Sequence, residues 1–147
     1  MTRIAIKATM QPELFVYSFP VRVYFENTDS GGVVYHGEYL KFLERARTEW
    51  LRHLGFDHQS LGRNHRVVFI VTSLAIDFAK PARLDDMLSV SVQLESVGRA
   101  RCVFAQEVRR EDDVLVRGKV TVACVTADHF KPVEIPENLR RKMEACL

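Results

Sequence analysis

Apolar positions change their spacing near residue 36. From Phe15 to Phe25 they alternate loosely with other side chains, which predicts a β-strand, and Pro20 places that strand at a sheet edge or a bulge. From His36 to Leu54 they recur every three or four residues, which predicts one long amphipathic helix. Gly55 stands where a left-handed cap would end it. The apolar stripe is wide: Tyr39, Leu40, Leu43, Ala46, Trp50, Leu51 and Leu54.

The remainder of the chain is predicted to be mainly strands. Four segments carry the strand pattern: 67–78, 88–95, 100–110 and 114–126. A polar turn at Glu111-Asp112-Asp113 joins the last two, and Gly118 is a candidate bulge. Residues 56–66 are expected to form a connecting loop. A short helix is expected from about Pro136, because proline suits a first helical turn.

This order of elements predicts an α+β fold. One long helix would pack on a sheet of about five antiparallel strands, with Leu43, Trp50 and Leu54 filling the concave face of a strongly curved sheet. The open edges of such a sheet expose unpaired backbone groups, which favours pairing with a second copy. We therefore expect at least a homodimer, with a tetramer as the alternative.

Composition narrows the class of protein. The chain has 147 residues, 47% of them hydrophobic, and 21 basic residues balance 19 acidic ones without forming a basic stripe. One globular domain fits this length, and a dedicated nucleic-acid binder is disfavoured. The three cysteines and five histidines lack metal-ligand spacing, so neither a metal nor another cofactor is expected.

The N-terminal residues carry no recognisable targeting signal. Lys7 interrupts the first apolar residues, and no apolar run approaches the ~20 residues that span a bilayer. We expect a cytoplasmic protein without a transmembrane segment. Residues 1–13 are interpreted as an N-terminal extension of unknown role, and residues 14–147 as the single domain.

The segment from Asp29 to His36 is the candidate site. It places a carboxylate and an imidazole at either end of a glycine turn, beside the predicted helix N-terminus. Unpaired amides at such a terminus can stabilise negative charge that develops on a carbonyl oxygen. The candidate donors are the backbone N–H groups of Gly32, Val34, Tyr35 and His36. Asp29 alone could equally be a turn residue and His36 a packed ring, but together they suit acyl transfer.

Two motifs resemble one enzyme family. Residues 22–36, which read RVYFENTDSGGVVYH, precede the helix sequence ERARTE at 44–49, and DFAKPARLDD follows at 77–86. From about Phe15 to the C-terminus, the chain is similar to the hotdog-fold acyl-CoA thioesterases. Within them it most resembles the bacterial Tol–Pal-associated branch of the 4-hydroxybenzoyl-CoA thioesterase-like family. This branch usually has Glu-Asp where Glu26-Asn27 stands, and Ala at Ser30.

The resemblance implies a sheet wrapped around the helix, pairing of two copies through their sheets, and hydrolysis of an acyl-CoA thioester. Asp29 matches the catalytic nucleophile or general base, the amide near His36 matches the oxyanion donor, and the His36 side chain lines the site. Glu44 is the alternative carboxylate, although Arg47 offers it an ordinary ion pair. Basic residues are candidates for the CoA phosphates: Lys80, Arg83, Arg99 and Arg101.

Other functions remain as alternatives. The chain could hydrolyse thioesters of acyl carrier protein instead of CoA. It could also bind acyl-CoA without turnover, as a sensor or an assembly module of the Tol–Pal envelope system. Acyl length and aromatic preference have no signature in the sequence.

Overall fold

The computed structural model describes residues 16–147, in which five antiparallel strands form one sheet. The predicted extension at residues 1–13 lies outside the described residues. Across the sheet, the strands follow the order β2 (Val16–Arg22), β4 (Met87–Val97), β5 (Arg101–Arg110), β6 (Asp113–Thr126) and β3 (Val67–Phe78). The predicted α+β architecture and strand count are therefore confirmed.

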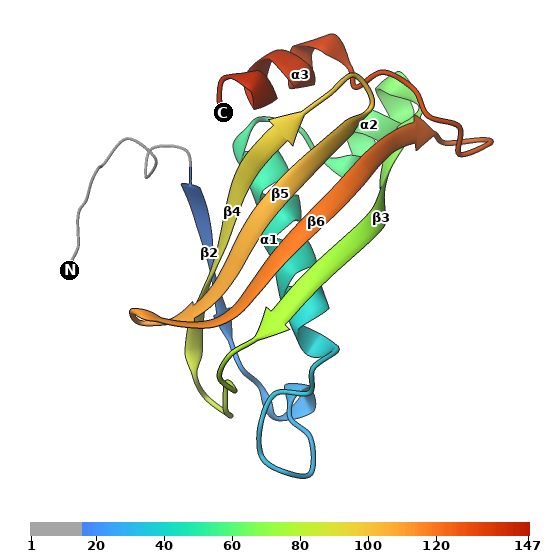
Figure 1. Cartoon of the computed structure of the whole chain (residues 1–147). Helices are drawn as coiled ribbons and strands as arrows, with labels where there is room; N and C mark the ends of the chain where they lie inside the picture. Colours follow the sequence, from blue (N-terminus) through green and yellow to red (C-terminus); the bar gives the residue numbers. More distant parts are fainter. Residues whose placement is uncertain (1–15) are drawn as a thin grey trace.

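Helix α1 (Glu38–His53) packs on the inner face of the sheet, behind the strands in Figure 1. Six of its side chains are buried: Tyr39, Phe42, Leu43, Ala46, Trp50 and Leu51. They face a row of alternate, buried residues of β4, and this period-two spacing is the pattern that predicted the strand: Leu88, Val90, Val92 and Leu94. Gly55 adopts φ = 93°, as expected of a left-handed residue after the helix. Leu54, the last position of the predicted stripe, is only half-buried.

The structure corrects the sequence analysis at several places. The first strand ends at Arg22, and a short 3-10 turn at Phe25–Asn27 follows it. The predicted loop at 56–66 contains helix α2 (His58–His65), whose first turn is capped by the Asp57 carboxylate. With one buried residue, Leu61, this helix has no apolar stripe to reveal it. Gly118 pairs in register with Gln106, without a bulge.

The two edges of the sheet differ. At one edge β2 is short and carries Pro20, as predicted. At the other, β3 is 12 residues long, and three of its inward-facing side chains stay exposed because α1 packs beneath other strands: Val71 (50%), Leu74 (39%) and Phe78 (50%). The inner face of β3 beside α1 is therefore uncovered.

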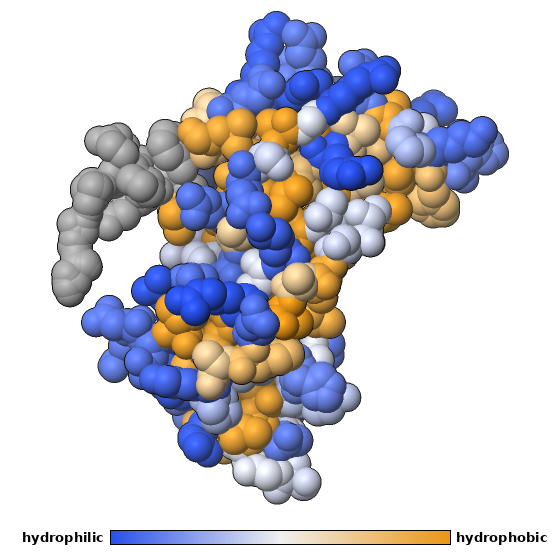
Figure 2. Space-filling view, viewed as in Figure 1, coloured by the Kyte–Doolittle hydropathy of each residue, from blue (hydrophilic) through white to orange (hydrophobic). Residues whose placement is uncertain are grey.

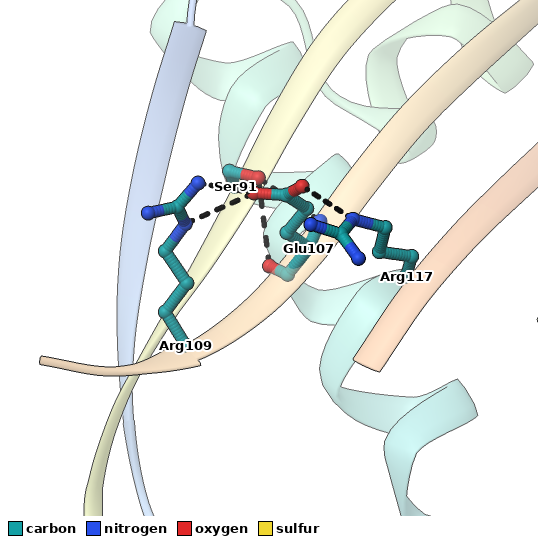
Figure 3. A network of polar contacts seen from close by, with 4 residues as sticks. All are labelled: Ser91, Glu107, Arg109 and Arg117. Carbon is teal, nitrogen blue, oxygen red and sulfur yellow. Dashed lines mark hydrogen bonds and ion pairs between the residues drawn. The ribbon is translucent and has the colours of Figure 1, made fainter. Parts of the chain in front are cut away.

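The outer face of the sheet is mixed in polarity, with hydrophilic and hydrophobic side chains interspersed (Figure 2). The Glu107 carboxylate accepts hydrogen bonds from Arg109 (2.6 Å) and Arg117 (3.1 Å), and the Glu107 N–H donates to the Ser91 hydroxyl (3.0 Å; Figure 3). Glu107 thus pairs with two arginines on a face that stays in contact with solvent, as is common for one face of an antiparallel sheet.

Helices α2 and α3 lie at the end of the sheet opposite the segment that precedes α1 (Figure 1). Helix α3 (Glu137–Glu144) follows Pro136, as predicted, and its side chains Leu139 and Met143 are buried against the core. Among the described residues, every helix is too short or too polar to cross a bilayer.

Candidate active site

Asp29 lies at the tip of a tight hairpin that joins β2 to α1. Its N–H donates to the Val33 carbonyl (2.9 Å), and its own carbonyl accepts from the Gly32 N–H (3.0 Å). Gly32 has φ = 81°, a conformation that a residue with a Cβ adopts only with strain. The glycine pair recognised in the sequence thus makes the turn that presents the carboxylate.

The Asp29 side chain is exposed and held by backbone donors. Oδ1 accepts from the Gly31 N–H at 2.8 Å and lies 3.4 Å from the Val33 nitrogen. A Cβ at position 31 would lie 3.2 Å from Oδ1, so glycine gives this carboxylate its room. Within residues 16–147, Oδ2 receives no hydrogen bond. One oxygen is therefore oriented and the other is free to react.

The candidate oxyanion donors separate into two groups. Three of them already donate to carbonyl oxygens of the chain: Gly32 to Asp29 (3.0 Å), Val34 to Ala82 (2.9 Å) and Tyr35 to Asn27 (3.0 Å). In the described part of the chain, the amide of His36 donates to no carbonyl. Helix α1 begins at Glu38, two residues later than predicted, so His36 precedes the N-cap Gly37. Of the four candidates, only the His36 amide is available to a substrate.

The His36 side chain contacts aromatic rings. Its ring centroid lies 4.3 Å from that of Tyr35 and 6.4 Å from that of Phe78, with the second pair edge to face. His36 and Phe78 are both exposed, which places an aromatic wall beside the free amide. The imidazole thus packs against aromatic rings beside its own backbone amide.

Backbone bonds and one buried hydroxyl fix this loop to the segment after β3. The Val34 N–H donates to the Ala82 carbonyl, and Val33 forms an isolated bridge with Arg83. The Ala82 N–H donates to the Tyr39 hydroxyl at 3.0 Å, and burial of that phenol raises its pKa. The two sequence motifs that carry the resemblance therefore meet in space.

Asn27 joins the loop to the helix, a role that sequence reasoning missed. Its buried side chain donates from Nδ2 to Glu38 Oε1 (2.7 Å), and its Oδ1 accepts from the Tyr24 N–H (2.7 Å). The hydrogen bond from Asn27, followed by one from Lys41, lowers the pKa of Glu38. In the sequence, Asn27 stood out only because the resembled branch has Asp at this position. That difference did not indicate a hydrogen bond to Glu38.

Arg110 is a second missed residue. It donates from Nη1 to Asp86 Oδ2 (2.8 Å) and to the Pro81 carbonyl (3.2 Å), which anchors the segment after β3. Burial raises the pKa of Asp86, but the Arg83 amide and Arg110 together lower it by more, so the group stays ionised. Nothing in the spacing of Arg110 indicated this contact, which crosses 24 residues of sequence.

The predicted phosphate-binding cations fall at opposite ends of the strands. Lys80 and Arg83 belong to the segment that contacts the Asp29 hairpin, and Lys80 makes an exposed ion pair with Asp113 (3.3 Å). Arg99 and Arg101 lie beyond the other end of β4, where Arg99 pairs with Glu134 (3.2 Å). An 11-residue strand spans about 33 Å. Of these four cations, only Lys80 and Arg83 belong to the segment that contacts the Asp29 hairpin.

The ion pair expected between Glu44 and Arg47 is absent from the described residues. Instead, Arg47 reaches under the sheet and donates from Nη1 to Gln106 Oε1 at 2.9 Å. Gln106 is buried (1% exposed), and its Nε2 donates to the carbonyls of Leu43 (3.1 Å) and Ser91 (3.2 Å). Glu44 stays exposed on α1, away from the Asp29 hairpin.

Comparison with known proteins identifies the family of this chain. Residues 31–117 match the model of the thioesterase superfamily. The chain is 47% identical to "Acyl-CoA thioesterase YbgC" of Haemophilus influenzae, covering 84% of this chain and 91% of that protein. It is 43% identical to "Acyl-CoA thioester hydrolase YbgC" of Escherichia coli O6:H1, covering 84% and 92%.

Solved structures give the same result. The crystal structure of a probable thioesterase from Bartonella henselae is 34% identical and superposes with a TM-score of 0.80, covering 82% of this chain and 99% of that one. The sheet curved around one long helix is the hotdog fold that the sequence motifs predicted. By sequence over most of its length and by fold, the chain belongs to the thioesterase superfamily.

Proposed function

We propose that this chain hydrolyses acyl-CoA thioesters to the free acid and CoA, with Asp29 as the reacting carboxylate and the His36 amide as the oxyanion donor. The observation that carries the proposal is the pairing of a fixed, exposed carboxylate with an unused amide just before a helix. Membership of the thioesterase superfamily supports the reaction type, and the names of the YbgC relatives support CoA as the carrier.

The chemistry follows from these two groups. The acyl carbonyl oxygen accepts from the His36 N–H, which stabilises the negative charge that develops on it. Asp29 Oδ2 either attacks the carbonyl carbon, forming an anhydride that water cleaves, or removes a proton from an attacking water. In the first route the C–S bond breaks as the anhydride forms, before water cleaves it, and in the second route it breaks after the water has added to the carbon. In both routes the thiolate leaves readily because a thiol pKa is near ~8.5.

Asp29→Asn tests the assignment. The amide cannot take the proton or attack efficiently, so turnover should fall by about 10²–10⁴ while the thermal unfolding curve is retained. Thiol release from a panel of acyl-CoA esters gives the measurement. Asp112→Asn is the matched control, because Asp112 is an exposed acid in the β5–β6 turn. Near-normal turnover by Asp29→Asn would contradict the assignment and favour Glu44, the alternative carboxylate.

The same panel addresses the alternative functions. Binding of CoA esters without thiol release would favour a sensor or an assembly module. Turnover of acyl carrier protein thioesters in preference to CoA esters would favour that carrier. Incorporation of ¹⁸O from labelled water into the Asp29 carboxylate over repeated turnovers would favour the nucleophilic route over the general-base route.

The proposal includes a second copy of the chain, joined at the β3 edge. The long row of backbone groups along β3, at the edge of the sheet, is the feature with which a partner would pair. A homodimer joined there, or a tetramer of two such pairs, would also be a way to bring the cations of one copy to the carboxylate of another. Sedimentation that shows only monomer at micromolar concentration would contradict this part of the proposal.

A further inference from the structure

A groove of ≈ 300 Å³ lies between α1 and β3, with Leu40, Leu43, Leu74 and Val120 on its apolar walls. Leu40, in the first turn of α1, follows His36 by four residues. Phe78, whose ring meets that of His36, ends the exposed row on β3 that includes Leu74. One end of the groove therefore lies close to the proposed reaction site.

A cavity of ≈ 170 Å³ adjoins this groove, between α1, the sheet and the short helices. Glu44, Arg47 and Val71 line both hollows, so Arg47 lies where the two adjoin. Apart from Glu44, Arg47, Thr48 and His58, the cavity walls are apolar, with Trp50, Phe69 and Phe104 among them. Apolar cavities of roughly 150 Å³ hold a molecule the size of benzene. An acyl group that follows the groove therefore has room for its far end.

Arg47 is unusual in this apolar setting. It is half-buried, and among residues 16–147 no carboxylate lies within ion-pair distance of it. Its one hydrogen bond is donated to Gln106, a neutral side chain that the Leu43 and Ser91 carbonyls hold in place. Burial lowers the pKa of Arg47, although a guanidinium stays charged at neutral pH. Of its five N–H donors, most are therefore left for another acceptor.

We propose that Arg47, positioned by Gln106, selects acyl groups that carry an oxygen acceptor at their far end. This inference rests on the proposed function, because it assumes that the acyl carbonyl lies at His36. Arg47 lies about 14 Å along the helix axis from Glu38, the first residue of α1, and helical side chains lean back toward the N-terminus, which shortens the reach. Glu44 beside Arg47 suits a hydroxyl, which accepts from the guanidinium and donates to the carboxylate.

Acyl-CoA esters of matched length test this selection. At each length, one ester ends in a methyl group, one in a hydroxyl and one in a carboxylate. For the wild-type chain, kcat/KM should favour an oxygen-bearing ester over the methyl ester by at least about tenfold at the best length, the worth of one hydrogen bond to a charged group. Arg47→Met should remove the preference, mainly through KM, and Arg47→Lys should restore part of it.

Arg45→Met is the matched control, because Arg45 is an exposed arginine on the same helix and lines neither hollow. It should keep the wild-type ratio. An unchanged ratio in Arg47→Met, or no preference in the wild-type chain, would overturn the inference. Loss of self-association in Arg47→Met with the ratio intact would also overturn it, by assigning Arg47 to the contact between copies.

The two proposals fail in different ways. Absence of thiol release from every ester would refute the proposed function. Release from methyl esters without preference for oxygen would leave the hydrolysis intact and refute the selection alone. A wild-type ratio near one refutes the selection without any variant, and a ratio that persists in folded Arg47→Met refutes the role of Arg47.

Discussion

The two ends of α1 use their backbone groups in opposite ways. At the N-terminal end, the hairpin around Asp29 is exposed, and the His36 amide and one carboxylate oxygen have no partner in the described chain. At the C-terminal end, the Leu54 carbonyl accepts from Lys142 (2.8 Å), and Trp50 packs edge to face on Phe104 at 5.1 Å. The comparison indicates that the polar groups without partners gather at one end of the helix, where the reaction is proposed, and the packing contacts at the other.

A substitution that leaves a cavity near the C-terminal end of α1 should give the largest loss in the free energy of unfolding. Leu61 is the buried residue of α2 (1% exposed), so Leu61→Ala should lower the free energy of unfolding by about 2–5 kcal/mol. Urea unfolding measures this. Turnover per folded molecule should fall far less than in Asp29→Asn. A variant as stable as wild type would show that α2 contributes little to the core.

At the N-terminal end of α1, Asn27→Asp should disturb the hairpin. It would replace the 2.7 Å hydrogen bond to Glu38 with a repulsion between two carboxylates, costing about 1.5–3 kcal/mol. Turnover should fall because the backbone carbonyl of Asn27 accepts from the Tyr35 amide, so a displaced Asn27 would also displace the segment that carries His36. Adding Glu38→Gln restores a donor and should recover much of both losses. Equal turnover in the single variant and the wild type would contradict the anchoring role.

Removing the cap of α2 should have a smaller effect, near the C-terminal end of α1. The Asp57 carboxylate accepts from the Ser60 N–H at 2.7 Å, and this bond lowers its pKa. Asp57→Ala leaves that helical N–H unsatisfied, so Tm should drop modestly while kcat/KM is retained. Asp57→Ser, which keeps a capping oxygen, is the matched control and should recover most of the Tm.

The smallest effect concerns pH. His58 is exposed overall, but its ring faces Thr48 (Nε2 to Oγ1, 3.4 Å), and partial desolvation of the ring lowers its pKa. As pH falls below about 6.5, the unfolded chain therefore binds a proton that the folded chain resists, and stability decreases. His58→Gln should flatten this part of the stability profile between about pH 5 and 7. An unchanged slope would assign it to other groups.

Local patterns predicted what depends on local sequence. The alternation in β4 identified its buried face, and the stripe of α1 identified the helix, because one face of each meets the core. Helix α2 escaped because it is eight residues long, polar, and set by a cap. The roles of Asn27, Arg47 and Arg110 depend on partners 11, 59 and 24 residues away, and single-sequence spacing carries no information on such pairs.

The sequence named more candidate donors than the fold leaves free: three of the four amides are bonded to carbonyl oxygens of the described chain. Glycine at 31 and 32 indicated a turn that would present Asp29, and the turn does so. Which amides stay free depends on the carbonyls that the fold brings near. The Val34 amide, for example, donates to the carbonyl of Ala82, which lies about fifty residues later in the sequence.

The hydrogen bond between Val34 and Ala82 also determines at which stage of folding the candidate site forms. The hairpin around Asp29 is held by residues 82–86, including reciprocal bonds between Val23 and the Asp85–Asp86 pair. A chain emerging from the ribosome has its carboxylate and amide long before it has these partners. Since contacts distant in sequence form late, thioester hydrolysis should return during refolding only with the whole sheet, not with helix formation. Recovery of activity thus reports completed folding of the sheet.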